Sequence, residues 1–367
     1  MTIPFVDLKS QYTSIKRQID TAIDDVINET SFIGGPHVKT FESEFAKVYG
    51  VKHCIGVANG TDALYITMKM LGIGPGDEVI TSASSWISTS ETITQTGARP
   101  VFVDIHPDTY TIDPDLIAKK INARTKAVIP VHLYGQAAHI QSIKELCDEQ
   151  GLFLIEDCAQ SHLTEEKGKL VGTWGTAGTL SFYPGKNLGA YGDAGAVITN
   201  DDTLAEKIRM YANHGALKKH EHKIEGVNSR LDAIQAAILS AKLPYLKKWT
   251  DQRIANANIY SNKLKESNLV LPRVRPLTKH SFHLYVIRSR KRDQLKAYVE
   301  SKGVQTAIHY PTALPNLPSY KYLNHQEADF PVASNYQREI LSLPMYPELT
   351  EEQIDYVCAR ILEFIQD

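Results

Sequence analysis

The chain has 367 residues, which is enough for a large hydrophobic core and favours two domains over one. Its 43% hydrophobic and 22% charged residues are ordinary for a soluble globular protein. The 40 lysines and arginines against 42 aspartates and glutamates leave a formal net charge of −2, so bulk charge recruits neither nucleic acid nor an anionic membrane.

Neither a targeting segment nor a membrane span is indicated. The first residues lack the charged stretch and apolar segment of a signal peptide, and no apolar run reaches the length of a membrane span. The cysteines at 54, 147, 158 and 358 show no paired spacing suited to zinc, so we predict no metal site. We expect a cytoplasmic protein that binds neither membrane nor nucleic acid.

Helical periodicity marks the N-terminal part of the chain. Residues 9–30 place Ile15 and Ile19 on one face, and residues 38–49 resume the pattern after a break at 31–36. These segments predict two amphipathic helices.

A short strand near residues 52–57 leads into a turn of small residues and a helix that starts near Gly60 and Thr61. The open N–H groups of a helix N-terminus beside a glycine form a ready phosphate site. Many strand–helix junctions have this pattern and bind nothing, so the turn is a candidate only.

Strands and helices alternate from there to about residue 212. The predicted strands are 78–81, 100–104, 127–131, 153–157, 178–182 and 196–199. The predicted helices between them include 86–96, 114–122, 138–150 and 201–212. This alternation predicts an α/β fold with a mainly parallel sheet that helices cover on both faces.

Helical patterns continue at 231–239 and 245–266, and after them the regular alternation of strands and helices ends. Strand-like runs at 281–289 and 304–309 flank a helix at 292–302, and a last helix covers 350–365. These elements predict a smaller α+β domain. We divide the chain into residues 1–30, which pack with the small domain, a large domain over 31–248 and the small domain over 249–367.

One lysine stands apart from the others in the chain. Lys186 lies among glycines, small residues and aromatic residues, and no charged residue is closer in sequence than Asp193. Such surroundings desolvate an amine, lower its pKa and make it a nucleophile toward carbonyls. The alternative is a loop lysine whose amine is in solvent.

A carboxylate upstream favours the reactive lysine. Asp157 ends the apolar run 151–157, and the carboxyl edge of a parallel sheet is where ligands bind in open α/β folds. Alone, Asp157 would more simply cap the next helix. A lysine and an acid together suit pyridoxal phosphate (PLP), which needs a Schiff-base lysine and an acid that keeps its ring nitrogen protonated.

Several motifs occur together in one order. With the ends of the resemblance at 3–8 and 343–347, they are 58–64, 130–135, 155–162, 181–186, 226–236 and 308–311. In this combination the chain resembles the DegT/StrS family of nucleotide-sugar aminotransferases, which are PLP enzymes of fold type I. The resemblance covers nearly the whole chain and implies that the large domain binds PLP.

The resemblance implies a role for each cofactor residue. Lys186 would form the Schiff base and move the proton, and Asp157 would pair with the pyridinium nitrogen. Gln160 would donate to the ring phenolate, and Trp86 would stack on the ring, the alternative for Trp86 being a buried core residue. The phosphate would be held by Gly60, Thr61 and Ser181, together with Asn228 from a partner subunit, which makes the active unit a homodimer with shared sites.

The resemblance also implies substrate contacts at Tyr183, His309 and Tyr310, and it places Arg230 near the anionic part of the sugar. His309 and Tyr310 could equally be core-edge residues with satisfied hydrogen bonds. The charge run at 218–223 is simplest as a solvated loop, with a lid over an anionic substrate as the alternative. Where many family members have small residues after 160–162, this chain has Leu163 to Glu166, which predicts a bulkier and more acidic wall.

The resemblance implies a transamination in two halves. Glutamate converts PLP to pyridoxamine phosphate (PMP), which then aminates a nucleoside-diphosphate keto-deoxysugar, and we expect C3 as the position. The setting would be amino-sugar biosynthesis for a surface polysaccharide such as O-antigen, or for a glycosylated metabolite. The alternatives are amination at C4, a PMP-dependent dehydratase, against which Lys186 argues, and a non-catalytic regulatory protein of the same fold.

Overall fold

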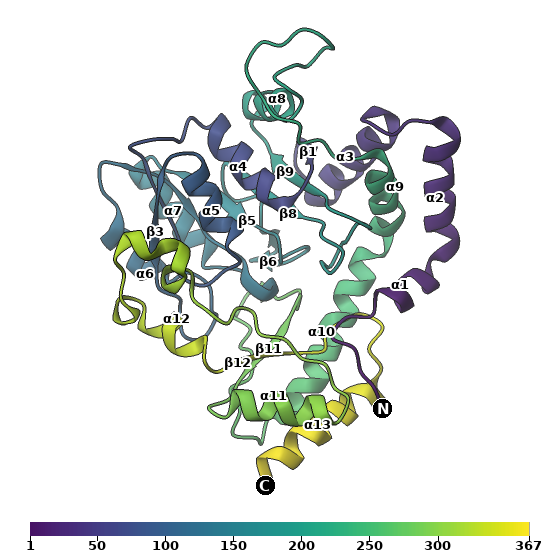
Figure 1. Ribbon diagram of the computed structural model, residues 1–367, viewed down its shortest axis with the longest axis vertical. Coiled ribbons are helices and arrows are strands. Elements are labelled where there is room, and N and C mark those ends of the chain that lie inside the picture. Colours follow the sequence, from purple (N-terminus) through teal and green to yellow (C-terminus); the bar gives the residue numbers. More distant parts are fainter. Residues whose placement is uncertain (367) are drawn as a thin grey trace.

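A seven-stranded sheet forms the centre of the upper part of the molecule (Figure 1). The computed structural model describes residues 1–366, and the strand order is β1-β9-β8-β5-β4-β2-β3. The strands are β1 (His53–Val57), β2 (Glu78–Ser82), β3 (Arg99–Val103), β4 (Thr125–Ile129), β5 (Phe153–Asp157), β8 (Ala177–Ser181) and β9 (Gly195–Thr199). β9 runs antiparallel to both of its neighbours, β1 and β8, and the other six strands all run in one direction. The predicted α/β class with a mainly parallel sheet is confirmed.

Helices cover both faces of this sheet because successive strand residues point to opposite sides. One face packs against α4 (Gly60–Met70), α5 (Ser88–Gln95) and α8 (Asp202–Tyr211). The other face packs against α3 (Gly35–Tyr49), α6 (Pro114–Ile117), α7 (Ile140–Gln150) and α9 (Ala233–Lys242). In β5, for example, Ile155 lies in the core under α4 and α5, whereas Leu154 lies in the core under α7. The two sides of β5 therefore face different environments.

The helix starts follow local capping chemistry. The side chain of Asn59 accepts a hydrogen bond of 2.8 Å from the N–H of Asp62 and so caps α4. Asp201 caps α8 in the same way, through the N–H groups of Thr203 and Leu204. These caps fix where α4 and α8 begin beside the sheet.

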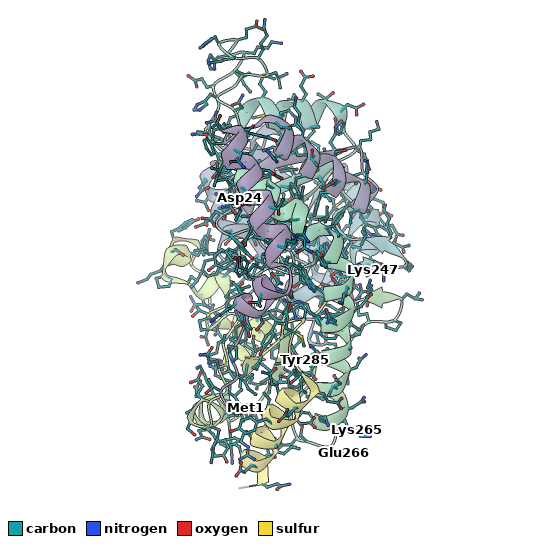
Figure 2. All side chains as sticks on the ribbon, turned by 90° about the vertical axis from the view of Figure 1, so that its right-hand side faces the viewer. Met1, Asp24, Lys247, Lys265, Glu266 and Tyr285 are labelled. Carbon is teal, nitrogen blue, oxygen red and sulfur yellow. The ribbon has the colours of Figure 1, made fainter. Side chains whose placement is uncertain are left out.

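A second, smaller unit occupies the lower part of Figure 1. It contains α10 (Leu246–Leu264), β11 (Tyr285–Arg288), α11 (Arg292–Ser301), β12 (Ile340–Leu343) and α13 (Glu351–Gln366). β11 and β12 pair antiparallel, and a buried core surrounds Tyr260 and Tyr285. Figure 2 marks Lys247 and Lys265 near opposite ends of α10, which therefore runs alongside both parts of the molecule.

One predicted strand of this unit is wrong. Residues 304–309 form only isolated bridges, from Val304 to Ile3 and from Ala307 to Ser342, because no neighbouring segment runs beside them over several residues. The strand that pairs with β11 is β12, which the sequence analysis did not predict. Its four residues are too short to give a periodic signal of their own.

The N-terminal segment contacts both parts of the molecule. The expected helix over 9–30 is split at Ile15 into α1 (Leu8–Ser14) and α2 (Lys16–Glu29). Ile19 on α2 packs against Ile238 and Trp249. Backbone bonds at Ile3 tie the chain start to the smaller unit, where Figure 2 shows Met1. The domain division at 30 and 248 remains a prediction.

The remaining short elements connect these parts. They are β6 (Glu165–Glu166), β7 (Lys169–Leu170), β10 (Thr278–Lys279), α12 (Pro331–Tyr336) and the 3-10 turns at 118–120, 133–135, 243–245, 314–316, 318–323 and 327–329. β10, β6 and β7 form a small sheet that joins residues from both parts. Within residues 1–366, no helix combines the length and the apolar character that crossing a membrane requires.

Gly195 allows β9 to pass very close to the start of α4. A Cβ atom at this position would lie 2.3 Å from the carbonyl carbon of Asn59 and 2.7 Å from the nitrogen of Gly60. Because these atoms are backbone, they cannot move aside as the end of a flexible side chain can. The contact holds the N-terminus of α4 against the sheet.

Replacing Gly195 with alanine should therefore destabilise the protein by at least about 2 kcal/mol, as overpacking against fixed atoms does. Urea unfolding followed by tryptophan fluorescence measures the change. Gly74→Ala is the matched control, because the nearest atom to its Cβ would be 3.6 Å away, and it should change stability by less than about 0.5 kcal/mol. Equal unfolding midpoints for the two variants would contradict this account of β9.

Candidate active site

The predicted cofactor residues gather at one edge of the sheet. Asp157 is the last residue of β5 and Ser181 the last residue of β8, while Gly60 follows β1 and Trp86 follows β2. These four strands run in the same direction, so their carboxyl ends meet at this edge. In open α/β sheets that edge is where ligands bind.

Asp157 is buried and held in one orientation. Its two carboxylate oxygens accept hydrogen bonds from the Thr89 hydroxyl at 2.8 Å and from the Ala159 N–H at 3.1 Å. The Thr89 hydroxyl is itself paired with that of Ser85 at 2.8 Å. Burial raises the pKa of Asp157, while these two hydrogen bonds and the charge of Lys186 oppose the rise. A cation beside this carboxylate would stabilise its ionised form.

Lys186 lies close enough to Asp157 for the two charges to interact. Desolvation lowers the pKa of Lys186 to about 8, and the Asp157 carboxylate opposes that shift. The backbone N–H of Lys186 donates to the carbonyl of Tyr183 at 2.8 Å in the turn after β8. The amine is therefore neutral in part of the molecules near neutral pH, as a nucleophile requires.

The three phosphate candidates converge at the start of α4. A Cβ atom on Gly60 would lie 2.7 Å from the Cβ of Ser181, so only glycine lets the helix start approach β8 this closely. The hydroxyl of Thr61 pairs with that of Ser88, the first residue of α5, at 2.7 Å. Within residues 1–366, the structure pairs no acceptor with the N–H groups of Gly60 and Thr61. They are available to an anion.

Gln160, Tyr310 and Trp86 form one connected group. The Gln160 amide donates to the Tyr310 hydroxyl at 2.9 Å, and its oxygen accepts from the Tyr134 N–H at 2.8 Å. The ring of Trp86 lies 5.5 Å from that of Tyr310, centroid to centroid. Trp86 is 57% exposed, which rules out the alternative of a buried core tryptophan and leaves a ring face free for a planar ligand.

His309 and Tyr183 flank this group, each in a different way. His309 bonds the Ser342 hydroxyl at 2.8 Å through Nδ1, and its other ring nitrogen forms no hydrogen bond with residues 1–366. Burial first, and then the charge of Lys186, lower the pKa of His309 to about 4, so it is neutral at neutral pH. The ring of Tyr183 is exposed next to the Lys186 turn. Both side chains can contact a substrate that approaches Lys186.

Asn228 and Arg230 lie apart from this group in the single chain. Asn228 is exposed, and Arg230 donates to the Asn213 side chain at 3.2 Å. Within the described chain, neither forms a hydrogen bond with Lys186, Asp157 or Ser181. A shared site across two subunits thus remains a prediction for these two residues.

The arrangement fits pyridoxal phosphate on the observations of this structure. An anion site of free helix N–H groups, a buried carboxylate and an amine of lowered pKa share one edge of the sheet. Near the amine, the ring nitrogens of the fully buried His162 have no partner among the described residues. The anion site, the carboxylate and the amine are the three chemical groups that a phosphorylated pyridine aldehyde requires.

Sequence reasoning missed the residues that hold the site. Thr89 fixes Asp157, Tyr134 fixes Gln160, and Asn187 pairs with the buried His283 at 3.1 Å beside Lys186. The run of serines and threonines over 82–92 was a possible signal for Thr89. The others come together only through the fold.

The expected acidic wall after His162 is wrong. Glu166 forms a short ion pair with Arg275, and Glu165 lies 3.6 Å from Lys279, so both carboxylates are neutralised in the small sheet of β6 and β10. Leu163 is buried in the core. The departure in sequence therefore changes the packing around β6 instead of the charge of the site.

A family model described as the DegT/DnrJ/EryC1/StrS aminotransferase family matches residues 13–362. The chain belongs to this family. The predicted family is confirmed, and with it the prediction of an aminotransferase.

Curated relatives of this aminotransferase cover nearly its whole length. It is 46% identical to the pleiotropic regulatory protein of Geobacillus stearothermophilus over 99% of both chains. It is 42% identical to the UDP-2-acetamido-2-deoxy-3-oxo-D-glucuronate aminotransferase of Pseudomonas aeruginosa, over 98% of this chain and 99% of the relative. It is 40% identical to the dTDP-3-amino-3,4,6-trideoxy-alpha-D-glucose transaminase of Streptomyces venezuelae, over 99% and 96% of the two chains.

Solved structures agree with the fold of this aminotransferase. DesV of S. venezuelae, in complex with a ketimine intermediate, matches with a TM-score of 0.98 and 39% identity over 100% of this chain and 99% of that chain. The ntda structure from Bacillus subtilis with bound cofactor PMP matches with a TM-score of 0.92 and 30% identity, over 100% and 86% of the chains. The predicted fold-type I architecture is confirmed.

The lowered pKa of Lys186 predicts how its reactivity changes with pH. In the cofactor-free protein, reductive alkylation of Lys186 by a small aldehyde should rise with pH through a midpoint near 8, because only the neutral amine attacks. Peptide mass spectrometry measures the labelling, with exposed lysines as the internal reference. Since the Asp157 charge raises the pKa of Lys186, Asp157→Asn should move the midpoint to lower pH. A midpoint that stays in place or rises would contradict this coupling.

Proposed function

We propose that this aminotransferase uses pyridoxal phosphate to transfer the amino group of glutamate to C3 of a nucleoside-diphosphate-linked keto-deoxysugar. The observation that carries the proposal is the closeness of Lys186, an amine of lowered pKa, to the charge of the buried Asp157 at the edge of the sheet where α4 begins. The ntda relative, solved with bound cofactor PMP, supports the choice of cofactor.

The cofactor, when bound, supplies a carbonyl that takes up the amino group and a protonated ring that stabilises negative charge on carbon. The N–H groups of Gly60 and Thr61 and the hydroxyl of Ser181 hold its phosphate. Trp86 stacks on its ring, which contributes about 0.5–1.5 kcal/mol and fixes the ring plane. Gln160 donates to the ring hydroxyl from the position in which Tyr134 holds it.

Asp157 and Lys186 divide the proton chemistry between them. Asp157, fixed by Thr89 and the Ala159 N–H, would accept a hydrogen bond from the protonated ring nitrogen and keep that nitrogen positive. With the cofactor bound, the Nζ of Lys186 would be the group that accepts and returns the proton of the substrate carbon that bears nitrogen. Its pKa of about 8 lets it both accept and release that proton near neutral pH.

The choice of a 3-keto sugar is supported by relatives. The aminotransferase of Pseudomonas aeruginosa is named for a 3-oxo sugar and that of Streptomyces venezuelae for a 3-amino sugar. One is named for a UDP sugar and the other for a dTDP sugar, so we propose no particular nucleotide. Tyr183, His309 and Tyr310 surround the approach to Lys186 and would contact the hexose. The product would serve amino-sugar biosynthesis, in which surface polysaccharides such as O-antigen are one use.

A regulatory role is the second candidate because one relative at 46% identity is named a pleiotropic regulatory protein. A binding protein that no longer catalyses would have no need of a nucleophile with a lowered pKa. This chain keeps Lys186, Asp157, Gln160 and Ser181 together at one edge of the sheet. Catalysis is therefore the better supported function.

The proposed active unit is a homodimer in which Asn228 of one subunit completes the phosphate site of the other. The loop over 213–228 projects from the upper end of the molecule (Figure 1). Exposed apolar side chains lie in this loop and in two segments that contact residues 232–235. They are Phe32, Ile33, Tyr191, Leu217 and Ile224. Such a surface is typical of one that a second copy covers.

The decisive test of the function is an absorbance spectrum followed by a substrate panel. With PLP bound, glutamate should replace the visible band of the protein-bound cofactor by the shorter-wavelength absorbance of PMP. A 3-keto nucleotide sugar, added after glutamate is removed, should restore the visible band, and a 4-keto sugar should do so more slowly. Lys186→Ala should bind the cofactor and fail in both steps.

The outcome of this test distinguishes amination at C3, amination at C4 and the regulatory role. Faster discharge by 4-keto sugars would assign amination at C4. The proposed catalysis would be contradicted, and the regulatory role favoured, if glutamate left the visible band unchanged and no keto-sugar altered the spectrum.

Mixed dimers test the shared site. Inactive Lys186→Ala and Asn228→Asp subunits, mixed and re-equilibrated in equal amounts, should regain roughly a quarter of wild-type activity, because half of the dimers then hold one intact site. Mixing Lys186→Ala with Asp157→Asn is the matched control and should give no rescue, since both residues come from the same subunit. Absence of rescue in dimers shown to be mixed would refute the shared site.

A further inference from the structure

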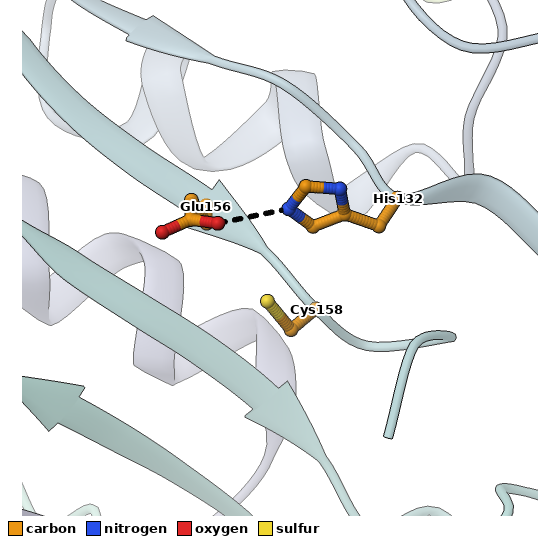
Figure 3. Close-up of side chains that lie close together, drawn as sticks. All are labelled: His132, Glu156 and Cys158. Carbon is orange, nitrogen blue, oxygen red and sulfur yellow. Dashed lines mark hydrogen bonds and ion pairs between the residues drawn. The ribbon is translucent and has the colours of Figure 1, made fainter. Parts of the chain in front are cut away.

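A buried histidine, glutamate and cysteine lie together behind the proposed cofactor site (Figure 3). Glu156 precedes Asp157 in β5, so its side chain points to the opposite face of the sheet. The Nε2 of His132, from the segment after β4, lies 3.1 Å from a Glu156 oxygen. Both side chains are fully buried. Neither residue has a place in the chemistry described so far.

The Glu156 carboxylate accepts four hydrogen bonds. One oxygen accepts the N–H groups of Trp174 at 2.7 Å and Gly175 at 2.9 Å. The other accepts the N–H of Gly172 at 2.7 Å and the His132 ring. Three N–H groups of the 172–175 loop and one imidazole thus converge on a single buried anion, which satisfies its charge without a cation.

The loop that supplies these N–H groups is packed backbone to backbone against the sheet. A Cβ atom on Gly175 would lie 2.3 Å from the Leu154 carbonyl oxygen, and one on Gly178 would lie 2.5 Å from the Gly172 carbonyl oxygen. The loop can therefore approach β5 only with glycine at these positions, and its polar backbone depends on Glu156 for acceptors.

These hydrogen bonds argue against a metal ion at the cluster. The Nδ1 of His132 accepts the Ala138 N–H at 3.0 Å, so the ring proton is on Nε2 and is donated to Glu156. A metal on Nε2 would force that proton onto Nδ1, against the Ala138 N–H. Burial also raises the pKa of the Cys158 thiol, which disfavours the thiolate that zinc binds.

Glu156 connects three segments that carry site residues. Its own strand ends in Asp157. The loop 172–175 leads directly into β8, which ends in Ser181 and precedes Lys186. His132 leads into Tyr134, whose N–H holds Gln160. The backbones of 132 and 157 are also paired, with the His132 N–H donating to the Asp157 carbonyl at 3.1 Å.

We propose that Glu156 is a positioning residue of this aminotransferase: its buried carboxylate sets the spacing of Asp157, Gln160 and the Lys186 segment from the far face of the sheet. It contacts neither cofactor nor substrate and acts through the backbone of β5 and the two segments it binds. The inference rests on the proposed roles of Asp157 and Lys186.

The isosteric change to glutamine distinguishes charge from shape. In Glu156→Gln, either orientation of the amide turns an NH2 group toward two donors, which are the Trp174 and Gly175 N–H groups or the Gly172 N–H and the His132 ring. Two buried donors then lose their acceptor in each orientation, and no flip removes the conflict.

The experiment measures PLP affinity and the pH midpoint of Lys186 alkylation in the cofactor-free protein. Glu156→Gln should weaken PLP binding about 10- to 100-fold, because relieving the two unpaired donors moves the 172–175 loop and β5 and so displaces Asp157 and the Lys186 segment. It should also move the alkylation midpoint to lower pH, because a displaced Asp157 raises the pKa of Lys186 less. Glu165→Gln, at a partly exposed ion pair, is the matched control and should leave both unchanged.

Variants of His132 keep the proposal testable if Glu156→Gln fails to fold. Glutamine at 132 can place a donor near the Nε2 position, whereas asparagine places its oxygen near Nδ1 and cannot reach Glu156. His132→Gln should therefore stay within about 3-fold of wild type in PLP affinity, and His132→Asn should lose about 10-fold. The reverse order would overturn the proposal.

Three further results would decide the question. A lower unfolding midpoint in Glu156→Gln, with unchanged PLP affinity and alkylation midpoint, would overturn positioning and leave a stabilising role only. Stoichiometric zinc binding by the wild type that Glu156→Gln abolishes would overturn the hydrogen-bond assignment. Failure of the wild type to bind PLP at all would instead refute the proposed function, so the two failures are distinguishable.

Discussion

The site depends on the interaction between two charges that the fold has taken out of water. Asp157 and Lys186 each lose solvation at the edge of the sheet, and each partly compensates the other. The charge of Lys186 opposes the rise in the pKa of Asp157, and the charge of Asp157 opposes the fall in the pKa of Lys186. An uncompensated buried charge is costly, so the surrounding structure has to fix both groups. Thr89, the Ala159 N–H and the turn at Tyr183 do so with hydrogen bonds that leave the carboxylate and the amine free to react.

A parallel sheet that is covered on both faces places neighbouring side chains of one strand in two different environments. On one side of β5, Asp157 faces α5 and the proposed cofactor. On the other side, Glu156 gathers the N–H groups of 172, 174 and 175 and the ring of His132. The alternation of strand side chains thus sends two adjacent carboxylates to opposite faces of the sheet, and we propose that one takes part in the chemistry and the other positions the site.

Close backbone approaches hold the segments of the site against the sheet. Gly60 against Ser181, Gly195 against Asn59, and Gly175 against Leu154 bring loops and strands nearer than any side chain would permit. Each contact joins a segment that carries a site residue to the sheet. The geometry of the site is therefore set by backbone packing as much as by the side chains that face the ligand.

The sequence by itself determined the order of strands and helices around the seven-stranded sheet, the family, and the residues most directly suited to the chemistry, because Lys186, Asp157 and Gly60 lie in local patterns that a strand end or helix start imposes. It did not determine that residues 304–309 lack a strand, that Glu165 and Glu166 are neutralised, or that Thr89, Tyr134 and His132 support the site. Those facts depend on contacts between residues far apart in the chain. Hydrogen bonds of that kind leave no periodic trace in a sequence, so only the tertiary structure decided them.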